Sequence, residues 1–425
     1  MKLKIIISTL ALFLVIGNAK IVNLDDLSNM ITSGEKDYYI WKFISSPNTT
    51  TEDAQKAIEQ ASYINGSMAK AYGEKTGIYV KAGTFCKTSD CAPPPPSNNT
   101  VQGNRYFYQG IKFVKSNDIE QALSYFNYSR QITDKPQDRD RATFWVYLLS
   151  QDKKYLDILN ESKDVNIYSL LGADFANVQY PKTITPKLKD REISGFDITD
   201  PIHWAKLKQK MFDPNTNLND LASKFEYDIT MPHYAYIRSV ATKYTEIYYP
   251  LPYRDALRSL PIERQAILYA IARQESRFIP ASVSRSFALG MMQIMPFLVK
   301  HIASERGENI NLDDIFDPHK ALQYSNHHLN YLDKYLHHPL FTAYAYNAGI
   351  GFTRGLIRRN DMFKTSGPFE PYLSMERIEN VEAREYGKKV LTNYVIYMNK
   401  LGEPTRILPL VQMLNNGTKI DRFRN

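Results

Sequence analysis

Glycine and cysteine are both scarce in this sequence, and their scarcity narrows the architectures that it can adopt. Only 19 of the 425 residues are glycine, and only two are cysteine. Few glycines, together with long stretches of apolar residues at helical spacing, favour helices over a turn-rich β architecture. After the first twenty residues no apolar run is long enough to span a bilayer, so we expect no integral membrane segment in the mature chain. The length predicts two or more domains.

The first nineteen residues have the pattern of a cleaved export signal. Lys2 and Lys4 precede the apolar stretch Ile5–Ile16, which is too short to span a bilayer as a stable helix. Gly17 and Ala19 then supply small residues at positions −3 and −1 of a cleavage site after Ala19. The alternative, a buried core helix, does not account for these three features occurring in order. We therefore expect an exported protein.

The two cysteines, Cys86 and Cys91, lie close together in the stretch Cys-Lys-Thr-Ser-Asp-Cys. In an exported chain a close pair is typical of a local disulfide, which is the interpretation we favour. The alternatives are half of a metal site, for which no histidine lies nearby, and a pair of free thiols. We expect no metal site here or at the histidine pairs 327–328 and 337–338, which are interpreted as surface residues.

Positive charge exceeds negative charge, and the formal net charge is +8 at pH 7. Most of the excess lies in residues 251–425, where 23 Lys and Arg accompany 17 Asp and Glu. A basic region of this kind suits an anionic polymer, such as nucleic acid, anionic lipid or an acidic glycan. Export argues against nucleic acid as a partner, and solubility alone is the plainer explanation of the charge.

Helical patterns organise the chain into two parts. The stretch Arg105–Phe126 resembles a tetratricopeptide-type helix pair, Arg141–Leu159 resembles a degenerate successor, and residues 20–248 are predicted to form an α-helical superhelix. Two prolines within Tyr249–Tyr253 break the helical pattern, so we place a domain boundary there. Residues 249–425 are predicted to form a second, mainly helical domain.

Smaller features follow from the same patterns. Residues 86–104, with the run Pro93–Pro96, are predicted to be a loop, and the polar tail after Asn415 is predicted to be loosely held. The helices predicted in the second domain are 262–276, 292–305, 319–336, 340–347, 350–358 and 382–399.

One carboxylate, Glu275, stands at the end of an apolar helix. Ile267, Ile271 and Glu275 recur at every fourth position, so the carboxyl projects from an apolar stripe. Burial raises the pKa of a carboxyl, as a general acid near neutral pH requires. The alternative is a capping or salt-bridged glutamate with Arg273 or Arg277 as its partner.

The polar segment after this helix contains residues that can build a site. Ser276 and Ser284 are expected to hydrogen-bond the Glu275 carboxyl and hold its orientation. Gly290 allows a close approach of the backbone to a ligand. Gln293 offers two donors and an acceptor to hydroxyl and amide groups. The helical patterns thus predict an all-α fold, and the helix end with its polar segment predicts a site with a single catalytic acid, Glu275.

Three ordered motifs resemble those of the soluble lytic transglycosylases, which cleave bacterial peptidoglycan. The resemblance covers about residues 246–400 and is weaker before residue 140. The motifs are Ala-Arg-Gln-Glu-Ser with Gly-Met-Met-Gln-Ile-Met-Pro (272–296), Ala-Tyr-Asn-Ala-Gly (345–349), and the stretch 378–386, in which Glu382, Arg384 and Tyr386 align.

The resemblance implies a lysozyme-like, mainly α catalytic domain after the superhelix, and it implies roles for the matching residues. Glu275 would be the catalytic acid and then the base. The residues that would line or shape the substrate site are Ser284, Gln293, Met295, Tyr346, Asn347 and Glu382. The departures from the usual family pattern are Met291 for Leu, Phe287 for a small residue, Glu379 for Pro and Ala383 for Thr.

The implied reaction cleaves the bond between N-acetylmuramic acid and N-acetylglucosamine and closes a 1,6-anhydromuramoyl end, without metal or cofactor. The implied location is the periplasm, and the implied partners are peptidoglycan strands and other cell-wall enzymes. One alternative is a lysozyme-like hydrolase that uses Glu275 with Glu382. The other is a non-catalytic cell-wall scaffold.

Overall fold

The computed structural model describes residues 22–83, 95–190, 193–364 and 367–424. Within these ranges the secondary structure consists of helices, with isolated β-bridges and no strands, so the predicted all-α class is confirmed. No helix in the described part is long and apolar enough to cross a membrane. The export signal and the pair Cys86 and Cys91 lie outside the described residues, and both stay predictions.

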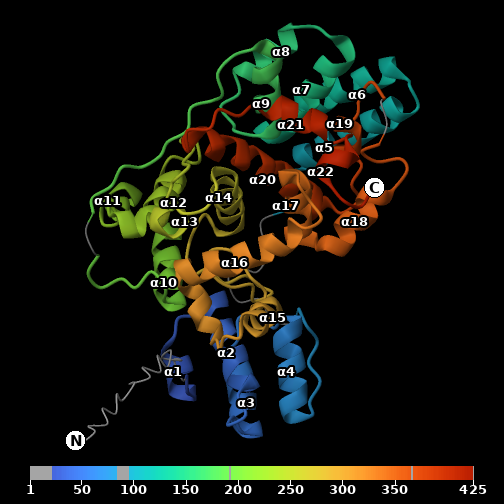
Figure 1. Ribbon diagram of the computed structural model, residues 1–425. Helices are drawn as coiled ribbons and strands as arrows, with labels where there is room; N and C mark the ends of the chain where they lie inside the picture. Colours follow the sequence, from blue (N-terminus) through green and yellow to red (C-terminus); the bar gives the residue numbers. More distant parts are fainter. Residues whose placement is uncertain (1–21, 84–94, 191–192, 365–366, 425) are drawn as a thin grey trace, which may run out of the picture.

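Four short helices at the N-terminal end lie together at the foot of the molecule in Figure 1. They are α1 (Leu24–Asn29), α2 (Gly34–Ser45), α3 (Thr51–Ile58) and α4 (Gly66–Thr76). Each begins after an Asn, Ser or Thr whose side chain accepts a hydrogen bond from the backbone N–H of the third helical residue. Such caps satisfy donors that a helix start leaves open and so fix where each helix begins.

The next five helices include the two predicted pairs. They are α5 (Asn98–Lys115), α6 (Ile119–Ile132), α7 (Pro136–Ser150), α8 (Lys154–Asn160) and α9 (Ile167–Ala176). The α5–α6 pair is tight because Gly110 faces the ring of Phe126, where an added Cβ would come within 2.6 Å of it. The predicted loop over 86–104 is wrong at its end, because Ser97 caps the amide of Thr100 and α5 begins at Asn98.

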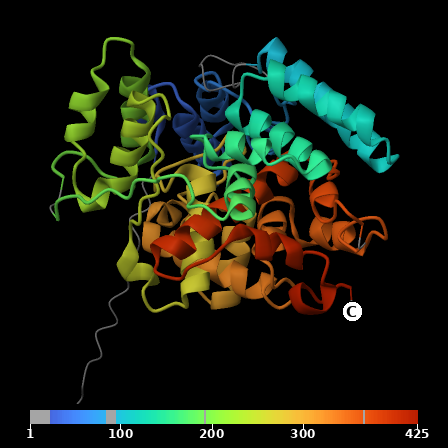
Figure 2. The same ribbon diagram turned by 90° about the horizontal axis from the view of Figure 1, so that it is seen from above.

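A third group of helices surrounds a small core of its own. Its members are α10 (Pro201–Phe212), α11 (Leu218–Ser223), the 3-10 turn η2 (Asp228–Thr230) and α12 (Met231–Ala241). Trp204, Phe225 and Ile237 are buried in this core, together with Ile279 from the later part of the chain. Seen from above, α10–α12, α1–α4 and α5–α9 lie along one side of the later helices (Figure 2).

The later helices carry the three motifs. They are α13 (Arg254–Leu257), α14 (Ile262–Ser276), α15 (Pro296–Arg306), η3 (Leu312–Phe316), α16 (Pro318–Leu332), α17 (Pro339–Ala348), α18 (Ile350–Arg358), α19 (Tyr372–Glu376), α20 (Val381–Lys400), α21 (Ile407–Met413) and α22 (Gly417–Ile420). The helix predicted over 292–305 begins only at Pro296, because Gln293 has a φ of 50° and Ile294 exchanges hydrogen bonds with Leu289.

Two minor predictions about the later part are wrong. The tail after Asn415 is held rather than loose, since Arg424 pairs with the buried Asp421 and donates to the carbonyl oxygen of Leu414. His338 is buried rather than on the surface. Its two ring nitrogens contact the carbonyl oxygen of Leu410 and the backbone N–H of Leu340.

A buried polar network joins the early helices to the later ones. Tyr168 on α9 donates to the carboxylate of Glu376 at 2.5 Å, and Lys388 on α20 lies 3.2 Å from the same carboxylate. Arg141 on α7 reaches Glu385 at 3.8 Å. One hydrophobic core also includes residues from both sides of the predicted boundary near residue 249. The division at that point stays a prediction.

The N-terminal helices also touch the later part, through an aromatic cluster. The ring of Phe287 stacks on Trp41 of α2 with centroids 5.2 Å apart, and Tyr38 meets it edge-on at 6.1 Å. Tyr38 and Lys42 both bond the carboxylate of Asp313, at 2.7 Å and 2.6 Å. The described N-terminal helices therefore support the segment that precedes α15.

Replacement of Trp41 by alanine is expected to loosen this contact. It removes the ring that stacks on Phe287, so the free energy of unfolding should fall by about 2–4 kcal/mol, as for other large aromatic truncations in packed surroundings. Trp41→Phe should retain most of the stability, because a ring still fills the space. Thermal and denaturant unfolding measure both effects. Tyr79→Ala, at a residue that is 88% exposed in the same region, is the control. Equal stability of Trp41→Ala and Tyr79→Ala would contradict the assignment.

Candidate active site

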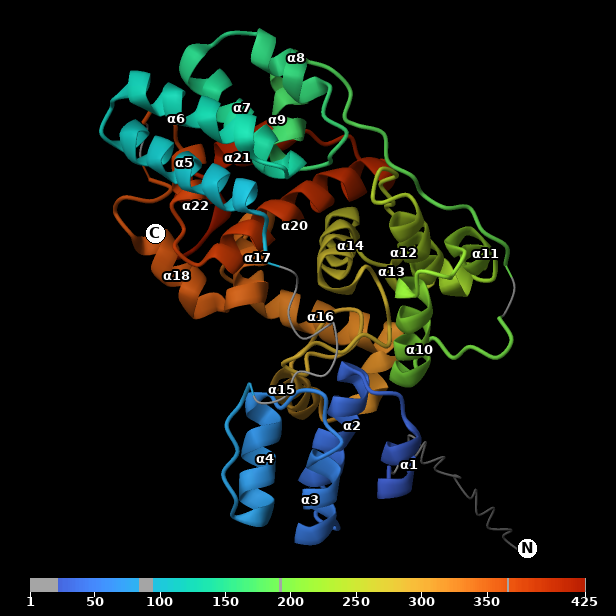
Figure 3. The same cartoon turned by 180° about the vertical axis from the view of Figure 1, so that it is seen from behind.

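The carboxyl of Glu275 lies at the end of α14, which stands in the middle of the molecule beside α20 (Figure 3). Asn393 on α20 donates to the carbonyl oxygen of Ala270 and accepts from Arg273 at 3.1 Å. These bonds tie the two helices together near the last turn of α14. The helix stops at Ser276 because Arg277 has a φ of 55°.

Among the described residues, one hydroxyl group holds the Glu275 carboxyl. Tyr386, one turn into α20, donates to its Oε1 at 2.6 Å. The pKa of Glu275 is raised to about 7, because burial and, to a smaller extent, the charge of Glu382 raise it while the hydrogen bond from Tyr386 lowers it. Since burial has the largest effect, the carboxyl is protonated in a substantial fraction of molecules at neutral pH. Such a group can donate a proton to a bound substrate.

Residues of the second and third motifs gather around this carboxyl. The Tyr346 hydroxyl donates to the carbonyl oxygen of Met292 at 2.9 Å and contacts Ser325 at 3.1 Å. Burial raises the pKa of Tyr346, and the charge of Glu275 adds to the effect, so this phenol stays protonated. Asn347 donates to Glu382 at 3.3 Å. The predicted residues Tyr346, Asn347 and Glu382 thus lie at one site with Glu275.

The segment 282–294 folds into a compact loop beside α14. The hydroxyl of Ser284 accepts hydrogen bonds from the backbone N–H groups of Ser286 and Ala288, at 3.2 Å and 2.9 Å. The Gln293 side chain donates to the carbonyl oxygens of Ser282 and Gly290. Ser284 and Gln293 therefore shape the loop through its backbone. The next predicted residue, Met295, is half-buried and precedes α15.

Gly290 is a position in this loop where glycine is required. It has a φ of 72°, and an added Cβ would lie 2.4 Å from the carbonyl oxygen of Ile315. Phe287 has a φ of 63°, which is uncommon for a bulky residue. Its fully buried ring is packed by Trp41 and Tyr38. The departure from the usual small residue is therefore accommodated by a partner from the N-terminal helices.

The predicted orientation of Glu275 by two serines is wrong. Ser276 donates to the carbonyl oxygen of Met291 at 2.7 Å, and Ser284 is engaged in its own loop. Tyr386 takes the place that these serines were expected to fill. The third motif indicated that Tyr386 belongs to the site. The sequence did not indicate that its hydroxyl contacts Glu275, because the two residues lie far apart along the chain.

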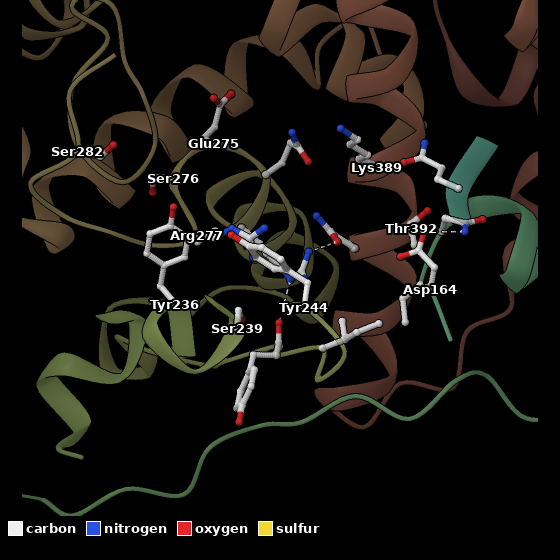
Figure 4. Close-up of a pocket in the computed structure, with 18 of the residues that line it drawn as sticks. Asp164, Tyr236, Ser239, Tyr244, Glu275, Ser276, Arg277, Ser282, Lys389 and Thr392 are labelled. Atoms are coloured by element: carbon white, nitrogen blue, oxygen red, sulfur yellow. Dashed lines mark hydrogen bonds between the residues drawn. The ribbon is translucent and has the colours of Figure 1, made fainter. Parts of the chain in front are cut away.

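The site opens onto a cleft with a volume of about 580 Å³ (Figure 4). Helices α2, α7, α9, α10, α12, α14 and α20 all contribute to its walls, and Glu275, Ser276 and Ser282 lie along it. Both parts of the chain thus border the cleft. Within the described ranges, no group of three or more His, Cys, Asp or Glu side chains is placed to hold a metal ion.

Residues 262–367 match the family model described as the Transglycosylase SLT domain. A putative soluble lytic murein transglycosylase of Haemophilus influenzae is 32% identical over 153 residues, which are 33% of this chain and 25% of that protein. The soluble lytic murein transglycosylase of Salmonella typhimurium is 27% identical over 249 residues, 55% of this chain and 37% of that protein. The matches span a quarter to somewhat over a third of these relatives' own length.

A solved structure of a 70-kDa soluble lytic transglycosylase in complex with bulgecin A has a similar fold. Its TM-score is 0.50 at 16% identity, and the alignment covers 88% of this chain and 58% of that one. The likeness concerns the fold alone. The resemblance to soluble lytic transglycosylases that the three motifs indicated is confirmed.

Replacement of Glu275 by glutamine is expected to stabilise the protein, and more so at high pH. The folded-state pKa of about 7 exceeds the ordinary value of 4.5. Between these values the carboxyl ionises in the unfolded chain but stays protonated in the folded one, so the contribution of Glu275 to the free energy of unfolding falls as pH rises and reaches its lowest level above pH 7. Glutamine removes this cost, which amounts to about 3 kcal/mol at pH 8.

Unfolding of wild type and Glu275→Gln at pH 4.5 and pH 8 measures this difference. The gain should be near zero at the lower pH and largest at the higher. Glu263→Gln, in the first turn of the same helix, is the control. A gain that does not depend on pH would contradict a raised pKa for Glu275.

Proposed function

We propose that this protein is a lytic transglycosylase, an enzyme that cleaves the β-1,4 bond between N-acetylmuramic acid and N-acetylglucosamine in peptidoglycan. One observation carries the proposal. A half-buried carboxyl, that of Glu275, has a pKa of about 7 within the region that matches the Transglycosylase SLT domain. The protein would release glycan fragments that end in 1,6-anhydromuramic acid.

The proposed mechanism uses Glu275 twice. Its protonated carboxyl donates the proton to the glycosidic oxygen, so the bond from that oxygen to C1 of the muramoyl residue breaks as positive charge develops at C1. The carboxylate that results is held by the hydroxyl of Tyr386. It then takes the proton from the C6 hydroxyl of the same sugar, whose oxygen forms the new bond to C1. The acid is regenerated, and no water is consumed.

The site-lining residues have proposed roles around this acid. Asn347 orients Glu382, which would be an auxiliary carboxylate at the edge of the site. Tyr346 would approach the scissile region, while Ser284 and Gln293 would maintain the loop that faces the sugar. Met295 would add an apolar, adaptable surface.

A lysozyme-like hydrolase is the second candidate within enzymes. Glycosidases of that type use two carboxylates, one as the acid and one as the base or nucleophile. Glu382 is exposed and bonded to Asn347, whereas Glu275 is half-buried, so Glu382 is less suited to that second role. A non-catalytic scaffold is disfavoured by the raised pKa of the Glu275 carboxyl and its hydrogen bond from Tyr386.

We also propose where the protein acts and how its two parts divide the work. It would be exported by cleavage after Ala19 and would act in the periplasm on peptidoglycan strands, beside other cell-wall enzymes. Residues 20–248 would form a superhelical domain that grips the strand, and residues 249–425 would form the catalytic domain. The cleft bordered by both parts supports this division of labour.

Product analysis tests the reaction. Wild type is expected to release muropeptides from purified peptidoglycan that are lighter by one water than reducing-end muropeptides, as mass spectrometry would detect. Glu275→Gln should fold normally and lower the rate by at least about a hundredfold, as expected for loss of a general acid. Reducing ends would support the hydrolase instead. No release by folded wild-type protein would refute both enzymes.

The pH profile tests the proposed acid and its partner together. Wild-type kcat/KM is expected to fall as pH rises above about 7, because Glu275 loses the proton that it must donate. Tyr386→Phe removes the hydrogen bond that favours the carboxylate, so its falling limb should move to higher pH. Tyr394→Phe, at a tyrosine two turns further along α20, is the control. An unmoved limb in Tyr386→Phe would exclude Glu275 as the group that titrates.

A further inference from the structure

A histidine, His233, is buried in the small core that α10, α11 and α12 share. It lies in the first turn of α12, and its side chain is fully buried. Neither of its ring nitrogens has a hydrogen-bond partner in the part of the chain that the structure describes. The ring centroids of Phe196, Trp204 and Phe225 lie 5.2 Å, 5.8 Å and 6.0 Å from that of His233. The imidazole thus occupies a place that suits an apolar ring.

This core can hold only the neutral form of the imidazole. A buried polar group without a hydrogen bond is already costly, and an imidazolium would bury a charge and two N–H donors without acceptors. Burial accordingly lowers the pKa of His233 to about 3. The ring can therefore take up a proton readily only after the core around it has opened.

The charges around this core do not offset the effect of burial. The elements around His233 carry four acids, two bases and a second histidine, which are Asp197, Asp200, Glu226, Asp228, Lys208, Arg238 and His203. Asp200 accepts from the N–H of Ile202, and His203 accepts from the N–H of Asp197. Lys208 pairs with Glu35, and Arg238 pairs with Glu246. Burial is the cause of the lowered pKa, and none of these charges counteracts it.

The helices around His233 form one wall of the cleft. Tyr236 and Ser239 on α12 lie along it, and Trp204 and Lys208 on α10 border it as well (Figure 4). The core of this wall is separate from the main hydrophobic core of the molecule. A part of a protein with a small core of its own can open locally while the remainder stays folded.

We propose that His233 makes the wall formed by α10, α11 and α12 sensitive to acid, so that this wall opens more often in acid while α14 and α20 stay closed. When the wall is open, water solvates the imidazole and the ring accepts a proton. The protonated ring cannot return to an aromatic core without acceptors, so closure requires that the proton is first released. This inference does not depend on the proposed reaction.

The expected dependence on pH follows from two pKa values. The pKa of His233 is about 3 in the closed wall and returns to the ordinary value of 6.5 in the open one. Above pH 6.5 the ring is neutral in both states. As pH falls from 6.5 towards 3, the open wall binds a proton that the closed wall excludes, so the ratio of open to closed molecules rises about tenfold per pH unit. At pH 4.5 this ratio should be about a hundred times its value at pH 7.5.

Hydrogen exchange, measured by mass spectrometry at pH 7.5 and pH 4.5 and corrected for intrinsic exchange rates, tests the inference without a substrate. In wild type, the protection of α10 and α12 is expected to fall about a hundredfold in acid, while α14 and α20 keep theirs. Glu275 cannot produce this loss, because its raised pKa makes it favour the folded state more at low pH. An equal loss in all four helices, or no loss in α10 and α12, would overturn the inference.

Two replacements of His233 remove its titration. His233→Phe places an apolar ring among the aromatic side chains, so the protection of α10 and α12 should be the same at both pH values. His233→Gln retains a polar group without partners but cannot gain a charge. Its α10 and α12 should be less protected than those of wild type at pH 7.5, with no further loss in acid. Thermal unfolding at pH 7.5 verifies the fold of both variants.

His203→Gln is the matched control, because His203 is the other histidine of this wall. Its ring is half-buried and stacks on Phe196, 5.6 Å away. This variant should retain the loss of protection in acid. A loss that disappears in His203→Gln but persists in the two His233 variants would overturn the inference. A loss that persists in all three variants would do the same and would assign the acid response to another group, such as the pair of Glu35 and Lys208.

Discussion

The burial of one carboxyl between α14 and α20 is the constraint on which the rest of the site depends. Glu275 must leave water to keep its proton near neutral pH, and the folded state bears the cost of that desolvation. Two hydrogen bonds offset part of this cost. The hydroxyl of Tyr386 lies 2.6 Å from the Glu275 carboxyl, and Asn393 links α14 to α20. The close packing of α17 on α20 completes the arrangement, since Gly387 leaves room for the ring of Tyr344.

Support for the site comes from regions far apart in the sequence. The loop that carries Ser284 and Gln293 packs against Trp41 through Phe287. Tyr168 on α9 bonds both members of the buried pair Glu376 and Lys388, and so joins α19 and α20 to the early helices. A buried ion pair of this kind adds little stability by itself, but removal of either partner is costly. The ion pair therefore fixes the orientation of α20 more than it adds stability.

The sequence predicted the helices and the partly apolar surroundings of Glu275 well, because both depend on local patterns. The bounds of α14 were predicted correctly, since its apolar stripe and polar end are local features. The start of α15 was not, because the left-handed backbone at Gln293 depends on the partner segment at Leu289. The hydroxyl on Glu275 was missed for the same reason, because Tyr386 lies 111 residues further along the chain.

The contact between Phe287 and Trp41 also has a consequence for the order of folding. The two rings are separated by most of the length of the chain, so their pairing is a strongly non-local contact and carries a high loop-closure cost. The backbone strain at Phe287 is offset only when its ring packs against Trp41. The loop should consequently reach its final shape late, after the helices on both sides have assembled, so a partly folded chain would hold an incomplete site.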